Sequence, residues 1–365
     1  MFLEMAQPMA LELYHAIIQH VDNTDDLLSL ALCCSAFGDE AQRCLLRHVE
    51  PKSKHQLTRL ISAINASPLR LGPLIHTFCL RERTASGEED PAAPLSISMA
   101  LRSMCNLEHL INDRPLPSTV LQGCTFKLRT LVWTCFLQKP SLLFLFCNFL
   151  PTQPSIKHLH LYQSEPFDLA EVPTNLCPML DSFKASDYNI ISCLLRDDRL
   201  ITRFQWRMME GLPKMTNRQV NHLKYLQCMM NKLDMDDSFT LQMTSLVFLE
   251  LHLKHFRSTE VRRLIQMLQF LQHIPRLEVL VMQNNSSKHR NFVPAYQHAF
   301  ELCPTLKYID ARYYLDEFYD RFFPPGDGDS DSENGALVTR RRVHEREVLG
   351  WRCTYGVGPA WSNYV

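Results

Sequence analysis

The chain has 365 residues, of which 46% are hydrophobic, and a formal net charge of −1 at pH 7. This length and composition predict an ordinary globular protein with a large core. Because the net charge is close to zero, the chain has no general attraction for phosphate backbones, and we expect no nucleic-acid binding.

The beginning of the sequence does not match a secretory signal. Residues 1–13 contain Glu4 and Gln7 and lack a basic segment followed by an apolar run. The longest apolar stretch, residues 141–150, is much shorter than the roughly 20 residues that a transmembrane helix needs. We therefore expect an intracellular protein, in the cytoplasm, the nucleus or both, without a membrane span.

The 13 cysteines do not form a metal-binding pattern. None lies in a C-x-x-C pair, and Cys33 and Cys34 are adjacent within an apolar helical pattern. Disulfides are rare in reducing compartments, so we expect the cysteines to be small buried hydrophobic residues. The sequence predicts no metal site and no cofactor.

Residues 9–49 show three helical patterns and form a module of their own. Leu13, Ile17 and Val21 lie on an apolar stripe of the first pattern, and Thr24 or Asp25 is placed to cap a second helix. A third pattern is expected beyond residues 38 and 39. About 40 residues rarely form a stable domain alone, and three short helices cannot bury all these apolar side chains. Part of the module should therefore dock, either on the following repeats or on another protein.

The spacing apolar-x-x-apolar-x-apolar recurs after this module and predicts a repeat architecture. Intervals of 21 to 45 residues are typical of irregular leucine-rich repeats, although leucine-rich sequences also produce such matches by chance. Residues 217–232 are expected to form a longer helix within the largest gap. The last apolar position is occupied by Asn112 and Ala185 in two copies. The nine predicted repeats begin at Ile75, Leu107, Leu128, Ile156, Leu180, Ile201, Leu246, Leu277 and Leu306.

Each repeat is predicted to contain one short strand and one helix. Side chains of a strand alternate between its faces, so Leu249 and Leu251 should face the core while Phe248 and Glu250 face outward. Residues 259–274 have the helical period. One repeat cannot cover its own apolar face, so the copies should stack with parallel strands on one side and helices on the other. Prolines that end a helix before the next strand support this prediction at Pro178, Pro275 and Pro304.

No motif of an enzyme is present. The chain lacks G-x-x-x-x-G-K-[ST], G-x-G-x-x-G and G-x-S-x-G. His158 and His160 should project from one face of a strand, but no third metal ligand is evident, so we interpret them as solvent-facing. The same interpretation applies to His252 and His255. We predict no catalytic residue and no enzymatic activity.

The outward strand positions are the candidate substrate-binding surface. They have no dominant charge and name no substrate class, so a binding role and simple solvation both remain open. These candidate residues are His158, His160, Ser182, Lys184, Arg203, Gln205, Phe248, Glu250, Tyr308 and Asp310.

The last part of the chain is expected to contain a loop and a cap. Residues 324–339 begin with an acidic segment rich in Gly, Pro and Ser, which predicts a flexible loop. Residues 340–365 include Trp351 and Trp361 and are too apolar for a free tail. We expect them to cap the last repeat, or to reach back along the outward strand face.

The N-terminal module resembles the F-box family. The family pattern Leu-Pro-x-Glu-Leu-x-x-x-Ile, followed by Asp-Leu-Leu and Val-Cys-Arg-x-Phe, matches residues 9–37 at most apolar positions. Ala10 stands where the family usually has proline, and Ser35 where it often has arginine. The resemblance implies that the following residues bind a Skp-type adaptor: Met9, Ala10, Leu13, Ile17, Leu27, Leu28, Leu32, Cys34 and Phe37.

An F-box followed by leucine-rich repeats is a known family architecture, so the repeats support the resemblance. It implies an α/β protein with a three-helix F-box at residues 9–49 and an irregular leucine-rich-repeat solenoid at residues 50–323. It also implies a substrate receptor of a cullin-type ubiquitin ligase, which links the adaptor and its cullin to a protein substrate. The alternative is a protein-interaction scaffold whose degenerate F-box engages no ligase.

Overall fold

The computed structural model describes most of the chain. The described residues are 11–21, 23–80, 93–114, 116–133, 139–161, 173–185, 188–196, 199–206, 215–230, 243–253, 261–284, 292–313, 318–324, 340–344 and 347–348. They belong to two compact units, Met1–Leu180 and Asp181–Val365. Each unit is α/β, and each is described by itself below.

The first unit begins with the three expected helices, α1 (Leu11–Ile18), α2 (Thr24–Ala31) and α3 (Ser35–Arg47). Two details of the prediction were wrong. The N-cap of α2 is Asn23, whose side chain accepts a hydrogen bond of 3.0 Å from the backbone N–H of Asp25. The third helix begins at Ser35 and includes Gly38, because the backbone of Cys34 is extended and can start a helix directly after it.

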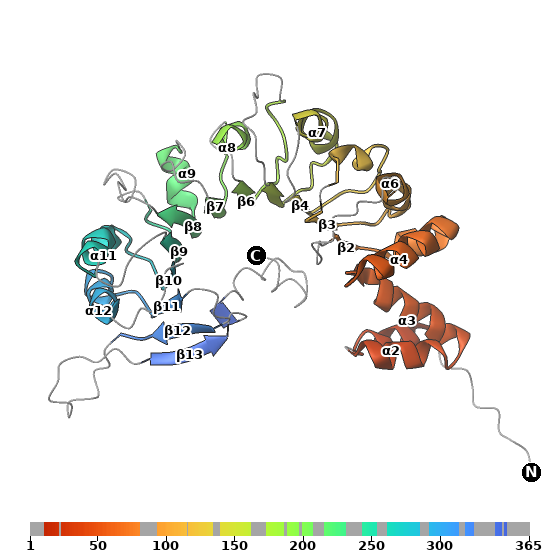
Figure 1. Ribbon diagram of the computed structural model, residues 1–365, viewed down its shortest axis with the longest axis horizontal. Helices are drawn as coiled ribbons and strands as arrows, with labels where there is room; N and C mark the ends of the chain where they lie inside the picture. The colour runs from red at the N-terminus through yellow and green to blue at the C-terminus, as the bar shows by residue number, and fades with distance from the viewer. Residues whose placement is uncertain are drawn as a thin grey trace, which may run out of the picture. The chain divides into compact units, whose positions relative to one another are not determined.

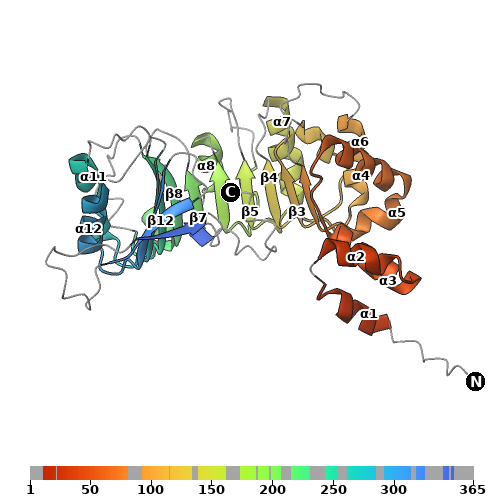
Figure 2. The same cartoon turned by 60° about the horizontal axis from the view of Figure 1, so that its bottom comes forward.

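Short strands and helices alternate through the rest of the first unit. The strands β1 to β5 pair in parallel with their neighbours in chain order. The helices α4, α6 and α7 lie on one side of these strands (Figures 1 and 2). The elements are β1 (His48–Val49), α4 (Lys54–Ala66), α5 (Pro68–Leu71), β2 (Thr77–Leu80), α6 (Ala93–Ser103), β3 (His109–Asn112), β4 (Thr130–Trp133), α7 (Lys139–Phe144) and β5 (His158–Leu161).

The second unit repeats this arrangement and ends differently. The strands β6 to β11 are parallel, and α11 and α12 lie on one side of them (Figure 2). The elements are β6 (Ser182–Ala185), α8 (Tyr188–Leu194), β7 (Arg203–Trp206), α9 (Asn217–His222), β8 (Tyr225–Met230), β9 (Phe248–Leu253), α11 (Val261–Leu268), β10 (Val279–Asn284), α12 (Val293–Leu302), β11 (Tyr308–Tyr313), β12 (Phe318–Phe322) and β13 (Arg340–His344).

All nine predicted repeat positions stand two residues before a strand, β2 to β7 and β9 to β11. Each of these nine residues is buried. A tight turn precedes each proline-marked strand: the backbone N–H of Leu180 donates to the carbonyl of Cys177 at 3.0 Å, and that of Leu306 to Cys303 at 3.0 Å. Proline fits the second position of such a turn because its φ is already fixed near the required value. The strand prediction is therefore confirmed at these positions.

The long helix expected at residues 217–232 was wrong. α9 ends at His222, and β8 follows at Tyr225–Met230. The sequence contains a tenth copy of the pattern here, Leu223-x-x-Leu226-x-Cys228, and all three side chains are buried. The helical interpretation of residues 217–232 concealed this copy, in which the cysteine packs as an apolar residue. Burial raises the pKa of the Cys228 thiol to about 12.

The expectation of parallel strands throughout fails at the end of the second unit. β12 pairs with β11 in antiparallel register, and β13 pairs with β12 in the same way. A short connection of residues 314–317 joins β11 to β12. A parallel return needs a crossover of a dozen or more residues, so only an antiparallel hairpin fits this connection.

The prediction that the cysteines are buried holds for only part of the described set. Cys33, Cys34 and Cys105 are exposed. The first two directly follow the short helix α2. The buried cysteines are Cys79, Cys177, Cys193, Cys228 and Cys303.

Alternating histidines and threonines form one register row across the first unit. The strand register places His48 beside Thr77, Thr77 beside His109, His109 beside Thr130, and Thr130 beside His158. The Nδ1 atom of His48 lies 2.9 Å from the hydroxyl of Thr77, and that of His109 lies 3.0 Å from the hydroxyl of Thr130. Burial lowers the pKa of His109 from 6.5 to about 4, and burial also lowers the pKa of His48. The His109 ring is therefore neutral at pH 7.

Replacing His109 with glutamine should reduce the acid sensitivity of the fold. In the unfolded chain His109 binds a proton near pH 6.5, whereas in the folded chain it binds one only near pH 4. The free energy of unfolding therefore decreases as the pH falls through this window. On acidification, the free energy of unfolding of His109→Gln should fall by about 2 kcal/mol less than that of the wild type. This figure allows for the partial solvent exposure of the ring. Urea unfolding followed by circular dichroism near neutral pH and near the lower end of this window measures the difference.

The exposed His55 of α4 provides the matched control. His55→Gln should follow the wild type at both pH values. An equal loss of stability in the wild type and in His109→Gln would contradict the assignment of this effect to His109.

Candidate functional site

The three N-terminal helices enclose a small core of their own. Ile18 of α1, Leu27 of α2 and Ala41 of α3 are buried against one another. Phe37 packs on this core, and its ring meets the Tyr14 ring edge to face at 4.7 Å between centroids. His15 of α1 also contacts Glu40 of α3 through their side chains. The module is thus held together by one residue or more from each helix.

Four large apolar side chains of the same helices remain exposed. Leu13 and Ile17 are four residues apart on α1 and are 53% and 45% exposed. Leu28 and Leu32 have the same spacing at α2 and are 51% and 88% exposed. Residues four apart lie on one face of a helix. We call Leu13, Ile17, Leu28 and Leu32 the exposed apolar set.

The predicted adaptor-binding residues therefore divide into two groups. Leu27 is buried and Phe37 is half-buried, so both belong to the core of the module. All four members of the exposed apolar set, together with Cys34, are accessible. Met9 and Ala10 lie outside the described residues.

The predicted substrate-binding residues are less exposed than expected. Arg203, Tyr308, His158 and His160 are half-buried. The expectation of solvent-facing side chains was wrong for the rest, because neighbouring side chains cover them. The buried members are Ser182, Lys184, Gln205, Phe248, Glu250 and Asp310.

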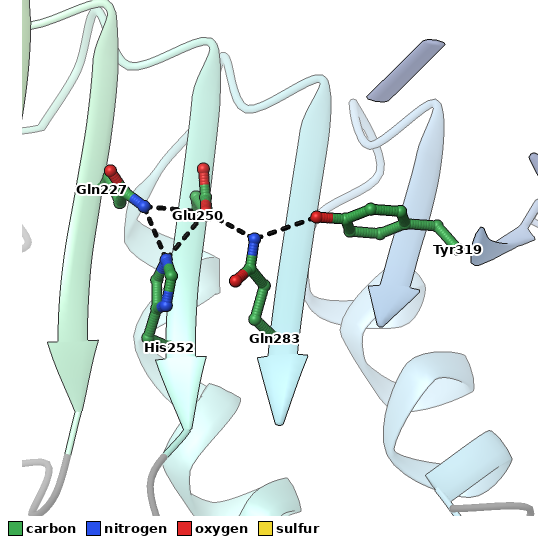
Figure 3. Close-up of polar contacts among 5 residues, drawn as sticks. All are labelled: Gln227, Glu250, His252, Gln283 and Tyr319. Atoms are coloured by element: carbon green, nitrogen blue, oxygen red, sulfur yellow. Dashed lines mark hydrogen bonds and ion pairs between the residues drawn. The ribbon is translucent and has the colours of Figure 1, made fainter. Parts of the chain in front are cut away.

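Glu250 of β9 is the centre of a buried hydrogen-bond network on the strand face that carries no helix (Figure 3). Its side chain is fully buried, and its Oε1 atom accepts hydrogen bonds from Gln227 of β8 at 2.8 Å and from Gln283 of β10 at 2.9 Å. The Nε2 atom of His252 lies 2.7 Å from the same oxygen. Gln283 also donates to the hydroxyl of Tyr319 at 2.9 Å. Several donors are needed here because a buried carboxylate without partners is very unfavourable.

His252 is thus not the solvent-facing residue that we predicted. Only 22% of its side chain is exposed, and its ring contacts Glu250 and Gln227. His255 lies outside the described residues.

A buried ion pair joins β11 to β12 on the same face. Arg321 donates from Nε to Oδ1 of Asp310 at 2.7 Å and from Nη2 to Oδ2 at 2.8 Å. The guanidinium also lies 4.1 Å from the centre of the Tyr308 ring. Burial raises the pKa of Asp310, while the hydrogen bond to Asp310 raises the pKa of Arg321. The pairing offsets part of the desolvation cost of burying these two charges.

The C-terminal segment covers part of this face. Val343 of β13, Val348 and Tyr319 of β12 pack with Phe248 of β9 and Val281 of β10 in one buried cluster. The register explains this packing, because Tyr319 pairs with Val343 and both point to the same side. The face of β9 and β10 is therefore occupied by the protein's own side chains.

This arrangement of polar side chains holds neighbouring strands in register. Among the described residues, no group of three or more His, Cys, Asp or Glu side chains could hold a metal ion. Sequence reasoning found Glu250 and Asp310 but missed their partners Gln227, Gln283 and Arg321. The Leu223 pattern would have placed Gln227 beside Glu250, whereas no repeat signal marks β12.

The chain matches no model of a known protein family and none of the curated proteins. Among the described residues, no helix is long and apolar enough to cross a membrane.

Replacing Asp310 with asparagine should destabilise the second unit. The change leaves the guanidinium of Arg321, 13% exposed, without its carboxylate partner. We expect a loss of about 3 kcal/mol, as is typical when one partner of a buried ion pair is removed. Urea unfolding monitored by circular dichroism measures the loss.

Glu278→Gln is the control for this change, because it breaks the exposed ion pair of 2.7 Å between Glu278 and Lys307. This pair should contribute less than about 1 kcal/mol. Similar losses for the two variants would show that the Asp310–Arg321 pair has no special importance for stability.

Proposed function

We propose that the protein is a substrate receptor of a cullin-type ubiquitin ligase. In this proposal the module at residues 9–49 binds a Skp-type adaptor, and a protein substrate binds the parts of the strand faces that the protein's own side chains leave accessible. The receptor performs no chemistry itself and acts by bringing two proteins together, in the cytoplasm, the nucleus or both.

The exposed apolar set is the observation that supports adaptor binding most directly. The core of the module is filled by Ile18, Leu27 and Ala41, yet four leucine and isoleucine side chains remain exposed on α1 and α2. Burying them in an interface would contribute roughly 4–8 kcal/mol before the costs of association. The resemblance to the F-box assigns these same four residues to adaptor contact.

The repeated strands support the second half of the proposal. Parallel strands with helices on one side leave the other strand face for recognition, as in stacked-repeat proteins generally. Arg203 and Tyr308 are half-buried members of this face in the second unit. Arg203 lies over the Tyr225 ring at 4.5 Å from its centre, so its guanidinium is held by stacking while part of it stays accessible. These two residues are the substrate contacts that we propose for the second unit.

Charge introduced into the exposed apolar set should abolish adaptor binding without unfolding the protein. The test compares wild type with a Leu28→Asp, Leu32→Asp double variant in a pull-down of the full-length protein with a purified Skp-type adaptor. Both residues are more than half exposed, so the fold should tolerate aspartate. We expect binding to weaken about 30-fold or more.

A matched control lies on α6, where Leu95 and Met99 are also exposed and four residues apart. The Leu95→Asp, Met99→Asp variant should bind the adaptor like the wild type. Leu27 is unsuitable for this test because it is buried, and its replacement would disrupt the core of the module. No binding by the folded wild type, or equal losses in both double variants, would favour a scaffold that engages no ligase.

A further inference from the structure

Cys33 and Cys34 are two exposed cysteines on adjacent residues of the N-terminal module. Together with Leu32 they form the whole connection between α2, which ends at Ala31, and α3, which begins at Ser35. Leu32 belongs to the exposed apolar set and is 88% exposed. Both cysteines are therefore accessible directly beside the surface that we propose for the adaptor.

The contacts that the structure describes for these two thiols are weak. The Cys33 thiol donates to the backbone carbonyl of Ser29 at 3.4 Å, and a thiol is a weak donor. Cys34 occupies the N-cap position of α3, and within the described residues its side chain makes no capping hydrogen bond. A soluble oxidant can therefore reach both sulfur atoms without first breaking a strong contact.

Adjacent cysteines can form a disulfide with each other, and such a bond is readily reduced. Disulfides usually join residues whose Cα atoms are about 4.4 Å or more apart, whereas Cα atoms across a trans peptide bond are about 3.8 Å apart. The peptide bond between Cys33 and Cys34 is trans. A disulfide within this small ring is strained, and strained, exposed disulfides are the labile ones. The pair thus suits reversible oxidation rather than a permanent structural bond.

Closing this ring changes the connection between α2 and α3. The ring includes the N–Cα bond of Cys34, whose φ is −159° while both cysteines are free thiols. The carbonyl of Cys34 also accepts the hydrogen bond of 2.8 Å from the backbone N–H of Gly38 at the start of α3. Leu27 of α2 and Ala41 of α3 hold the two helices in the core of the module. The adjustment therefore falls on the connecting residues, and Leu32 moves with them.

We propose that Cys33 and Cys34 are a redox site at which oxidation by a peroxide weakens adaptor binding. One cysteine, as its thiolate, attacks the O–O bond of hydrogen peroxide, forms a sulfenic acid and releases hydroxide, which takes up the thiol proton to give water. The second thiol attacks the sulfenic sulfur, forms the disulfide and releases a second water molecule. A soluble dithiol reverses the oxidation and itself becomes a disulfide. The regulation rests on the proposed adaptor binding, whereas the disulfide chemistry does not.

Mass spectrometry of the full-length protein tests the disulfide directly. The protein is treated with hydrogen peroxide, its remaining thiols are alkylated, and trypsin then cuts after lysine and arginine. Residues 1–43 contain no lysine or arginine before Arg43 and no cysteine besides Cys33 and Cys34, so both thiols lie in one peptide. We expect this peptide to lose two hydrogen atoms and to resist alkylation until a dithiol is added. Alkylation of both cysteines after peroxide treatment, or addition of oxygen without a disulfide, would overturn the proposal.

A pull-down of the full-length protein with a purified Skp-type adaptor tests the regulation. Peroxide should weaken binding by the wild type about tenfold, because the displaced Leu32 loses its apolar contact, and a dithiol should restore it. Cys33→Ser cannot form the ring and should bind like the reduced wild type before and after peroxide. Cys105→Ser removes an exposed cysteine outside the module, so it is the matched control and should respond like the wild type. An unchanged circular dichroism spectrum after oxidation shows that the fold is intact.

The outcomes separate the redox site from the proposed ligase function. Equal weakening of the wild type and Cys33→Ser by peroxide would show that the ring is not the cause. Undiminished binding by a wild type that contains the disulfide would overturn the regulation. No binding by the reduced wild type would overturn the proposed function and the regulation with it, while the peptide mass still decides whether the disulfide forms.

Discussion

The structure depends on the parallel pairing of short strands that each bury one face. A four-residue strand such as β3 or β7 cannot exclude water from its apolar side alone, and each repeat contributes only a small part of a core. Pairing with the strands on both sides extends the buried surface. The turns before the strands fix where each one begins, so the side chains of successive strands line up in rows.

These rows explain why the polar side chains lie where they do. Once the first residue of each strand is aligned with the next, every second residue must share a face with its counterparts. In the first unit this alignment produces the row of histidines and threonines from His48 to His158. In the second unit it places Gln227, Glu250 and Asp310 in one row. The position of these polar residues is thus a consequence of strand register, and Gln227, Glu250 and Asp310 each come from a different strand.

The sequence predicted the positions of nine strands well because the signal is local. The spacing of three apolar residues within six positions requires no knowledge of distant parts of the chain, and it located nine strands. It failed at β8, where residues 217–232 were interpreted as one long helix. One of the two imperfect positions, Asn112, is buried, and its side chain bonds the backbone of Arg114 at 3.0 and 3.2 Å, which a leucine could not do.

The partners of the polar residues were not predictable in this way. Arg321 and Tyr319 come from β12, which is antiparallel to β11, and the repeat spacing does not predict this change of direction. The burial of Phe248 likewise depends on Val343 and Val348, nearly 100 residues later in the chain. A surface inferred from alternation alone therefore indicates which side chains share a face, and long-range packing decides which of them meet solvent.

Large apolar side chains are covered in the second unit but exposed in the N-terminal module, and this difference in exposure bears on function. The second unit covers Phe248 and Val281 with its own C-terminal valines. The N-terminal module fills its core and still leaves Leu13, Ile17, Leu28 and Leu32 in solvent. Three short helices have too little interior for these residues, since a small module buries a small fraction of its surface. Exposure on α1 and α2 is therefore built into the size of the module, and a partner that covers both helices would complete the burial that the module cannot achieve alone.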